Sequence, residues 1–269
     1  AFANSPLSEY MVHYKGNLKK KLSKDTVAPD VNLPRYRQLA DLVRQYAKDS
    51  IVEVGTWNGG RAIEMSLAAF EKSDKVHYTG FDLFEEATEE LDKVELNSKA
   101  HNTLEAVTKR LTEFAAKMAE KDKTFTFELF KGDSKDTLKK AKDNLKDVSF
   151  AYIDGGHSEE TVQSDYSYLK HAPIVVFDDF FSKDKDGNIL GDEYLGTNRL
   201  VESLKDKRIT VLPSQDRVKG GGHTYLAVLI NDESFEDIPA HLRRVPIVVQ
   251  PRDSVPQDDI VDNINKNVE

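Results

Sequence analysis

Short apolar runs alternate with amphipathic helical segments along most of this chain, and that alternation is the feature that most constrains its fold. The apolar runs are SIVEV, VHYTGFD, FTFELFK, FAYI and PIVVFDDFF. Between them, apolar residues recur at spacings of three and four, as in the segment from Leu104 to Met118. Strands that alternate with helices at this pace predict a mostly parallel sheet with helices on both faces.

The C-terminal part changes character. RITVLP and HTYLAVLIN follow one another as strands, with a triple glycine at 220–222 between them. This pattern is typical of an antiparallel hairpin that closes the edge of a sheet. We therefore predict an α/β, Rossmann-like sheet over residues 35–232, an N-terminal arm or lid over 1–34 and a C-terminal extension over 233–269.

Composition excludes several classes of function. The net charge of −9 argues against nucleic acid or an anionic membrane as the main partner. No apolar stretch approaches the roughly 18 residues that a membrane span needs, and no signal-peptide pattern opens the chain. The absence of cysteine excludes disulfides and thiolate metal sites.

A glycine-rich turn follows the first strand of the alternating series, in SIVEVGTWNGG. Gly55 would permit a tight turn, and Gly59 would let the backbone approach a ligand closely. Thr56 lies within the turn. The dinucleotide pattern G-x-G-x-x-G is absent, and Glu53 precedes the first glycine by two residues. An acid there would repel a pyrophosphate but could hold a ligand ammonium group.

Acidic residues also end the next two strands. Asp82 is a natural acceptor for ribose hydroxyls, and Asp133, followed by Ser134, can accept a hydrogen bond from an adenine amino group. The alternative is structural, because aspartate at these places commonly caps the following helix.

Three carboxylates and an imidazole follow the two most apolar strands. FAYIDGGHSEE carries Asp154 and His157, and PIVVFDDFF carries Asp178 and Asp179. Neighbouring parallel strands end about 4.8 Å apart, so their carboxylates would repel one another and raise one another's pKa values. A hard divalent cation such as Mg²⁺ would remove that conflict. Capping of the next helix is an equally good explanation for Asp154 alone.

The order of these motifs resembles that of the class I S-adenosylmethionine-dependent methyltransferases over roughly residues 35 to 230. Their first motif is an acid-x-Gly-x-x-x-Gly turn, which Glu53, Gly55 and Gly59 match. The resemblance implies that S-adenosylmethionine is held by the residues after the first three strands, namely Glu53, Gly55, Thr56, Gly59, Asp82, Asp133 and Ser134.

IDGGHSEETVQSDYSYL and VVFDDF further resemble cation-dependent O-methyltransferases, especially those that act on macrolide sugars. This implies a Mg²⁺ site at Asp154, Asp178 and Asp179, with His157 as the general base. Two features depart from the wider family. Asp179 stands where the catechol and caffeoyl type has Asn, and KHAPI replaces the Gly-Gly turn before the last metal strand.

We therefore expect a metal-dependent O-methyltransferase that acts on a hydroxylated small molecule, a sugar or a glycosylated metabolite. The cytoplasm is the expected compartment, because the methyl donor is made there, and the arm could pack on a second copy of the chain. Alternatives are a nicotinamide-dependent oxidoreductase and a non-catalytic member of the same fold. Some relatives with this metal motif are also associated with hydroxylation of antibiotic precursors.

Overall fold

The computed structural model of the 269-residue chain describes residues 33–95, 97, 99–182, 195–218, 222–239 and 242. Nearly all of the expected N-terminal arm, residues 183–194 and most of the expected C-terminal extension lie outside the described residues. Within them, none of the helices combines the length and the apolarity that a bilayer crossing requires.

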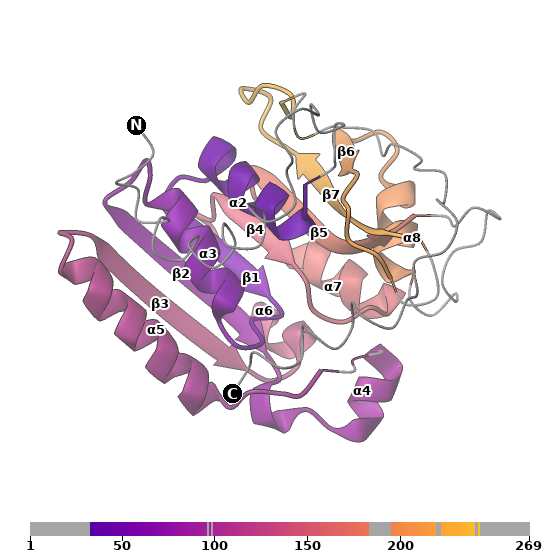
Figure 1. The fold of residues 1–269 in the computed structure, drawn as a ribbon. Coiled ribbons are helices and arrows are strands. Elements are labelled where there is room, and N and C mark those ends of the chain that lie inside the picture. The colour runs from indigo at the N-terminus through magenta and orange to yellow at the C-terminus, as the bar shows by residue number, and fades with distance from the viewer. Residues whose placement is uncertain are drawn as a thin grey trace, which may run out of the picture.

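Seven strands form one sheet in the order β3-β2-β1-β4-β5-β7-β6 (Figure 1). The first five strands are parallel to one another, whereas β7 runs antiparallel to both β5 and β6. The strands are β1 (Ser50–Val54), β2 (Lys75–Asp82), β3 (Thr124–Lys131), β4 (Phe150–Ile153), β5 (Ile174–Phe181), β6 (Ile209–Leu212) and β7 (Thr224–Ile230). This order, with its reversed penultimate strand, is the class I methyltransferase arrangement and confirms the predicted fold class.

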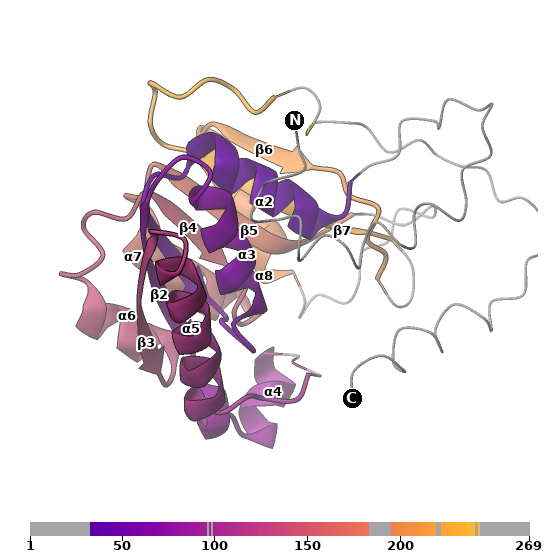
Figure 2. The same cartoon turned by 60° about the vertical axis from the view of Figure 1, so that its left-hand side comes forward.

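Helices cover both faces of the sheet, as the two views in Figures 1 and 2 show. One face carries α2 (Arg35–Tyr46), α3 (Gly60–Ala69) and α5 (Leu104–Ala119), and the other carries α6 (Ser134–Ala141), α7 (Glu159–Leu169) and α8 (Gly196–Ser203). Alternate strand residues serve alternate faces: Ile51 packs with the first group, and Val52 packs with the second.

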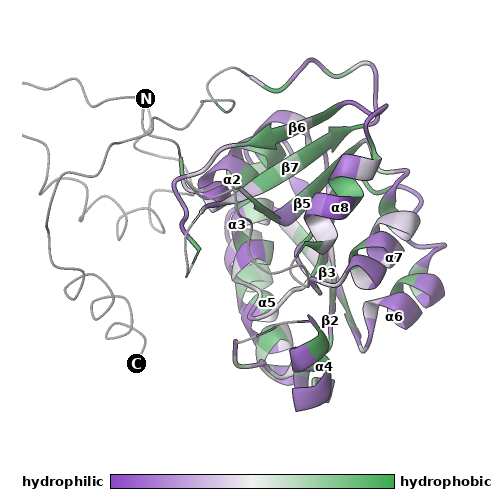
Figure 3. Cartoon of the chain, turned by 90° about the vertical axis from the view of Figure 1, so that its right-hand side faces the viewer, coloured by the Kyte–Doolittle hydropathy of each residue, from purple (hydrophilic) through white to green (hydrophobic). Residues whose placement is uncertain are grey.

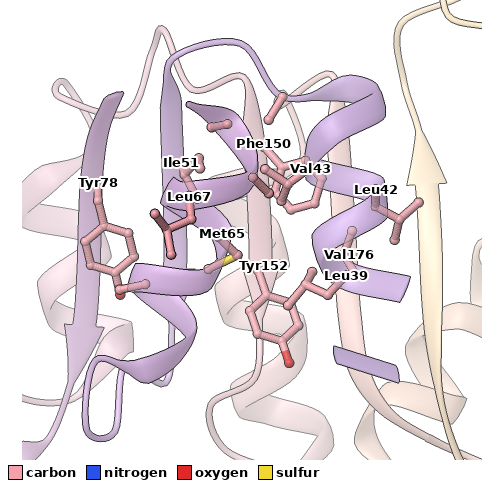
Figure 4. Close-up of a cluster of buried hydrophobic side chains, with 14 of the residues drawn as sticks. Leu39, Leu42, Val43, Ile51, Met65, Leu67, Tyr78, Phe150, Tyr152 and Val176 are labelled. Atoms are coloured by element: carbon pink, nitrogen blue, oxygen red, sulfur yellow. The ribbon is translucent and has the colours of Figure 1, made fainter. Parts of the chain in front are cut away.

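The core follows from this alternation, because strands buried on both faces must be apolar on both. In Figure 3 the strands are accordingly green and the outer surfaces of α6 and α7 are largely purple. Figure 4 shows Leu39, Val43 and Met65 from α2 and α3 against Phe150, Tyr152 and Val176 from the sheet.

Two short elements between β2 and α5 were not predicted from the sequence. They are a 3₁₀ turn at Phe84–Glu86 and α4 (Glu89–Glu95). This acidic segment has no apolar periodicity that would predict a helix, and in the structure none of the residues of α4 is buried. It stands at the edge of the molecule toward which the parallel strands point (Figure 1).

The pairing of β5 with β7 contains an irregularity. Phe177 pairs with Ala227 and Phe180 pairs with Tyr225, so Asp178 and Asp179 together lie opposite Leu226. Asp179 adopts a left-handed backbone conformation with φ 54°. Two residues against one is a β-bulge, which bends the strand and redirects its side chains.

Candidate active site

The carboxyl ends of β4 and β5 place a cluster of carboxylates at one edge of the sheet. Ile153 ends β4 and pairs with Phe177, so Asp154 directly follows β4 and lies level with Asp178 inside the longer β5. The Tyr152 hydroxyl joins them, because it lies 3.1 Å from Asp154 Oδ2 and 2.6 Å from Asp178 Oδ2. The bulge then brings Asp179 to the same edge, where its backbone N–H donates to Asp178 Oδ1 at 2.8 Å.

Mutual repulsion and burial set the charge of this cluster. Burial raises the pKa of Asp154 well above its usual value, and the nearby charges of Asp178 and Asp179 raise it further. Burial also raises the pKa of Asp178, against the opposing effect of Arg35. Such raised values are expected for carboxylates that are buried away from water beside other carboxylates.

Arg35, at the start of α2, is one cation that the protein itself supplies. Its Nε lies 2.8 Å from Asp178 Oδ1, and its backbone N–H donates to Asp216 Oδ2 at 3.1 Å. Its Nη2 donates to the Tyr36 hydroxyl at 2.8 Å. Arg35 therefore ties the first turn of α2 both to the end of β5 and to the segment between β6 and β7.

His157 is the second cation, because it donates from Nε2 to Asp179 Oδ2 at 2.7 Å. Burial lowers the pKa of His157, but the hydrogen bond to Asp179, its negative charge and the hydrogen bond to the Glu95 carbonyl together outweigh burial, and the pKa rises to about 9. The same bond lowers the pKa of Asp179, although burial raises it. In this arrangement the imidazole is protonated at neutral pH. It can act as a base only after Nε2 has lost its proton, and the hydrogen bond to Asp179 opposes that loss.

A small cavity lies between these groups, lined in part by Asp154, Gly156, His157, Asp178, Asp179 and Thr197. Three carboxylates supply the hard oxygen ligands that Mg²⁺ prefers, so the donor set fits a divalent cation chemically. Among the described residues, however, no three His, Cys, Asp or Glu side chains are already arranged as a coordination shell. Arg35 and His157 engage carboxylate oxygens that such an ion would need.

The glycine turn after β1 directly adjoins this cluster. Gly55 has φ 93°, and a Cβ there would lie 2.0 Å from the Asp154 carbonyl oxygen. Gly59, with φ 76°, precedes the first residue of α3. The Trp57 backbone N–H donates to Asp82 Oδ2 at 2.7 Å, so the turn is held to the end of β2.

Glu53, two residues before the first glycine of this turn, is fully buried. Its Oε2 accepts from the Tyr78 hydroxyl at 2.5 Å, and that hydroxyl lies 3.1 Å from Thr56 Oγ1. Burial raises the pKa of Glu53 to about 8, although the hydrogen bond from Tyr78 lowers it.

Asp82 and Asp133 both serve the backbone here. Asp82 accepts from the N–H groups of Trp57 and Phe84, each at 2.7 Å. Asp133 is the N-cap of α6 and accepts from the Lys135 N–H at 2.9 Å. The structural role that the sequence left open for both is thus present. Each carboxylate retains lone pairs for a ligand.

Sequence comparison assigns the central part of the chain. Residues 52–180, which hold the glycine turn and the carboxylates, match a family model described as a methyltransferase domain. Over these residues the chain is similar to a methyltransferase domain. This finding favours methyl transfer over the nicotinamide-dependent alternative. Comparison with curated proteins gives no significant match.

Solved structures with similar folds include several methyltransferases. One is the O-methyltransferase TomG from Streptomyces achromogenes, involved in tomaymycin synthesis, with 15% identity, 83% of this chain and 98% of that chain covered, and a TM-score of 0.47. Another is the calicheamicin methyltransferase CalS11, with 17% identity, coverage of 85% and 88%, and a TM-score of 0.48. A putative caffeoyl-CoA O-methyltransferase from Staphylococcus aureus has 12% identity, coverage of 83% and 92%, and a TM-score of 0.45. These similarities are too low to indicate a substrate.

Three residues that lie at or beside the carboxylate cluster, Tyr152, Arg35 and Glu95, were not predicted from the sequence. Tyr152 could have been found, because it lies two residues before Asp154 and therefore on the same strand face. Arg35 and Glu95 gave no such signal, since each is far from the carboxylates in sequence. Ser134 begins α6, and its hydroxyl lowers the pKa of the buried Asp165 of α7, against burial, which raises that pKa to about 7.

A larger cavity of about 300 Å³ opens at the opposite edge of the sheet, beside Lys48, Ser149 and His171. The His171 ring pairs with the Leu145 carbonyl and the Ser149 hydroxyl with the Ser50 carbonyl, each at 2.7 Å. This cavity lies at the amino ends of the strands, away from the glycine turn and the carboxylates. Ligands of open α/β sheets bind at the carboxyl ends of the strands, so we place the candidate active site at the glycine turn and the carboxylates and not at this cavity.

The buried Glu53 gives a prediction about stability and pH. Its pKa is about 8 in the folded protein against 4.5 as the model value, so the folded state binds this proton more tightly. The free energy of unfolding should therefore fall as pH rises from about 4.5 to about 8, by an upper bound of about 5 kcal/mol. Glu53→Gln should remove this decline.

Urea unfolding of both proteins between pH 5 and 9 measures it, with Glu90→Gln on the exposed side of α4 as control. Parallel curves for wild type and Glu53→Gln would contradict the assignment.

Proposed function

We propose that this protein is an S-adenosylmethionine-dependent O-methyltransferase that acts on a hydroxyl of a small molecule, a sugar or a glycosylated metabolite. The observation that supports it best is the contact between the glycine turn and the carboxylate cluster. A Cβ on Gly55 would overlap the Asp154 carbonyl, so a methyl donor seated on the turn would lie beside the residues that handle the acceptor. Holding two reactants together in this way supplies much of the rate of a group transfer.

Three features support S-adenosylmethionine as the donor. The methyltransferase match covers the turn, the positive φ values of Gly55 and Gly59 open its backbone to a ligand, and Asp82 stands at the end of β2. The absence of a dinucleotide glycine pattern argues against a nicotinamide cofactor.

The acceptor chemistry is proposed from the carboxylates and His157. Asp154, Asp178 and Asp179 would hold Mg²⁺ or another hard divalent cation, whose charge lowers the pKa of a bound hydroxyl. If Asp179 engaged that cation instead of His157, Nε2 would lose its proton to solvent more easily and the neutral ring could take the hydroxyl proton. The acceptor oxygen would then receive the methyl group from the sulfonium, and S-adenosylhomocysteine would leave. Tyr152, between Asp154 and Asp178, orients the two carboxylates.

Calorimetric titration with S-adenosylhomocysteine, with and without Mg²⁺, tests the proposal. We expect wild type and an Asp178→Asn/Asp179→Asn double variant to bind S-adenosylhomocysteine alike, and only wild type to respond to Mg²⁺. Asp216→Asn is the matched control, because Asp216 also contacts Arg35, at 3.5 Å, but does not belong to the cluster.

Two outcomes would contradict different parts of the proposal. If neither protein binds S-adenosylhomocysteine, the cofactor assignment is wrong. If wild type binds it but does not respond to Mg²⁺, or the double variant responds equally, the metal site is wrong and methyl transfer would rest on His157 and the protein's own cations. The product mass then separates methylation from hydroxylation, since the first adds a methylene and the second an oxygen.

A further inference from the structure

The segment α4 has no core to hold it, yet its last residue reaches the active site. No residue of α4 is buried, and it stands away from the sheet at the carboxyl edge in Figures 1, 2 and 3. Its position must therefore depend on polar contacts. Glu95, its final residue, makes several of them with the loop that carries His157.

The Glu95 carboxylate binds the beginning of α7. Oε2 accepts from the Ser158 N–H at 2.9 Å, and Oε1 accepts from the Ser158 and Thr161 hydroxyls at 2.9 and 2.6 Å. Ser158 is the N-cap of α7, where a negative charge is favourable. Although burial raises the pKa of Glu95, these hydrogen bonds lower it, which indicates that the charged form fits the site.

The backbone of Glu95 acts on the His157 ring. Its carbonyl oxygen lies 2.5 Å from His157 Nδ1. A carbonyl can only accept a hydrogen bond, so Nδ1 must carry a proton whatever the charge of the ring. Nε2 is consequently the nitrogen that faces Asp179 and the active site.

The surrounding loop is shaped around these contacts. A Cβ on Gly156 would lie 2.3 Å from Glu95 Oε2, so only glycine leaves room for the carboxylate. From the opposite side, the Gly196 N–H donates to the His157 carbonyl at 3.1 Å. The main chain of His157 is thus held by α8, and its ring is held by Glu95.

We propose that Glu95 is a positioning residue for His157, its carboxylate locking the end of α4 onto the start of α7 and its carbonyl fixing which ring nitrogen faces the acceptor. The inference rests on the proposed function only in giving His157 a role with the acceptor. The geometry of the ring can be tested without any acceptor.

Nuclear magnetic resonance of the full-length protein labelled with ¹⁵N-histidine tests the proposal. In wild type, the His157 Nδ1–H should give a ring N–H signal that persists in water, and its absence from His157→Gln assigns it. Glu95→Ala should lose this signal to solvent exchange, since the carbonyl is no longer held in place. Glu95→Gln keeps one acceptor oxygen but sets an amide against the Ser158 N–H, so it should weaken the signal without abolishing it.

Glu90→Ala, an exposed change on the same helix, is the matched control and should leave the signal as in wild type. An unchanged His157 signal in Glu95→Ala, or an equal loss in Glu90→Ala, would overturn the proposal. Glu95→Gln keeps the test decisive should Glu95→Ala fail to fold, because an undiminished signal in that variant would also overturn it. Failure of the proposed function is distinguishable, since it would appear as a lack of S-adenosylhomocysteine binding while the ring signal still reports on Glu95.

Discussion

Replacing His157 with alanine is expected to reduce methyl transfer about 10²–10⁴-fold, the usual contribution of a general base, and to leave binding of S-adenosylhomocysteine unchanged. The ring contacts Asp179 and the Glu95 carbonyl and no part of the glycine turn. Its pKa of about 9 adds a second expectation. Any turnover that remains without added Mg²⁺ should rise with pH up to about that value, because only the neutral imidazole accepts a proton, and the variant should lack this rise.

The measurement is transfer of labelled methyl groups from S-adenosylmethionine to acceptors found by screening sugars and glycosides. His77→Ala is a suitable control, because His77 pairs with Thr126 near the start of β2, at the opposite end of the strand from the site. Turnover retained in His157→Ala would exclude this residue as the base. Loss of S-adenosylhomocysteine binding would mean that the ring supports the fold of the site instead.

Replacing Gly55 with alanine is expected to destabilise the fold by more than about 4 kcal/mol, a loss that only a few mechanisms produce. Two effects combine. The φ of 93° is unfavourable for any residue with a Cβ, at about 1–2 kcal/mol. The new Cβ would also lie 2.0 Å from the Asp154 carbonyl oxygen, and a backbone atom between two paired strands cannot move aside cheaply.

Gly59→Ala separates these two effects. Gly59 has φ 76°, but its Cβ would meet only side chains, of which Val107 is the nearest at 3.2 Å and Leu111 and Arg110 lie farther away, and side chains can shift. We expect this variant to lose about 1–2 kcal/mol from backbone strain alone. Urea unfolding at one pH gives both free energies. Equal losses of unfolding free energy in Gly55→Ala and Gly59→Ala would show that the close approach of the Asp154 carbonyl adds nothing to the requirement for glycine at position 55.

The alternation of strands and helices was predictable because it is a local property of the sequence. Each strand is buried on both faces and is therefore a continuous apolar run, as in β4 and β5. The helix α4 was not predictable, because nothing in it packs against a core.

The candidate site was predictable where it depends on strand ends. Asp154, Asp178, Asp179 and His157 come together because parallel strands end at one edge, and the sequence indicates those ends directly. The contacts that set their charges depend on pairs far apart in the chain, such as Arg35 with Asp178 and Glu95 with Ser158. No periodicity or motif encodes such pairs. The internal orientation of Glu53, toward Tyr78, follows from packing and was likewise not visible.

Because of the bulge in β5, two consecutive residues contribute carboxylates to the same cluster, whereas a regular strand would direct them to opposite faces. In regular pairing, neighbours along a strand point to opposite faces, so an Asp-Asp dipeptide would deliver only one carboxylate to the edge. Here Asp178 and Asp179 both lie opposite Leu226, and both reach the cluster. Removing a single residue between Phe177 and Phe180 would restore regular pairing and leave one acid at the edge. In the evolution of such a domain, a one-codon deletion could therefore halve the charge that β5 contributes without altering the order of the sheet.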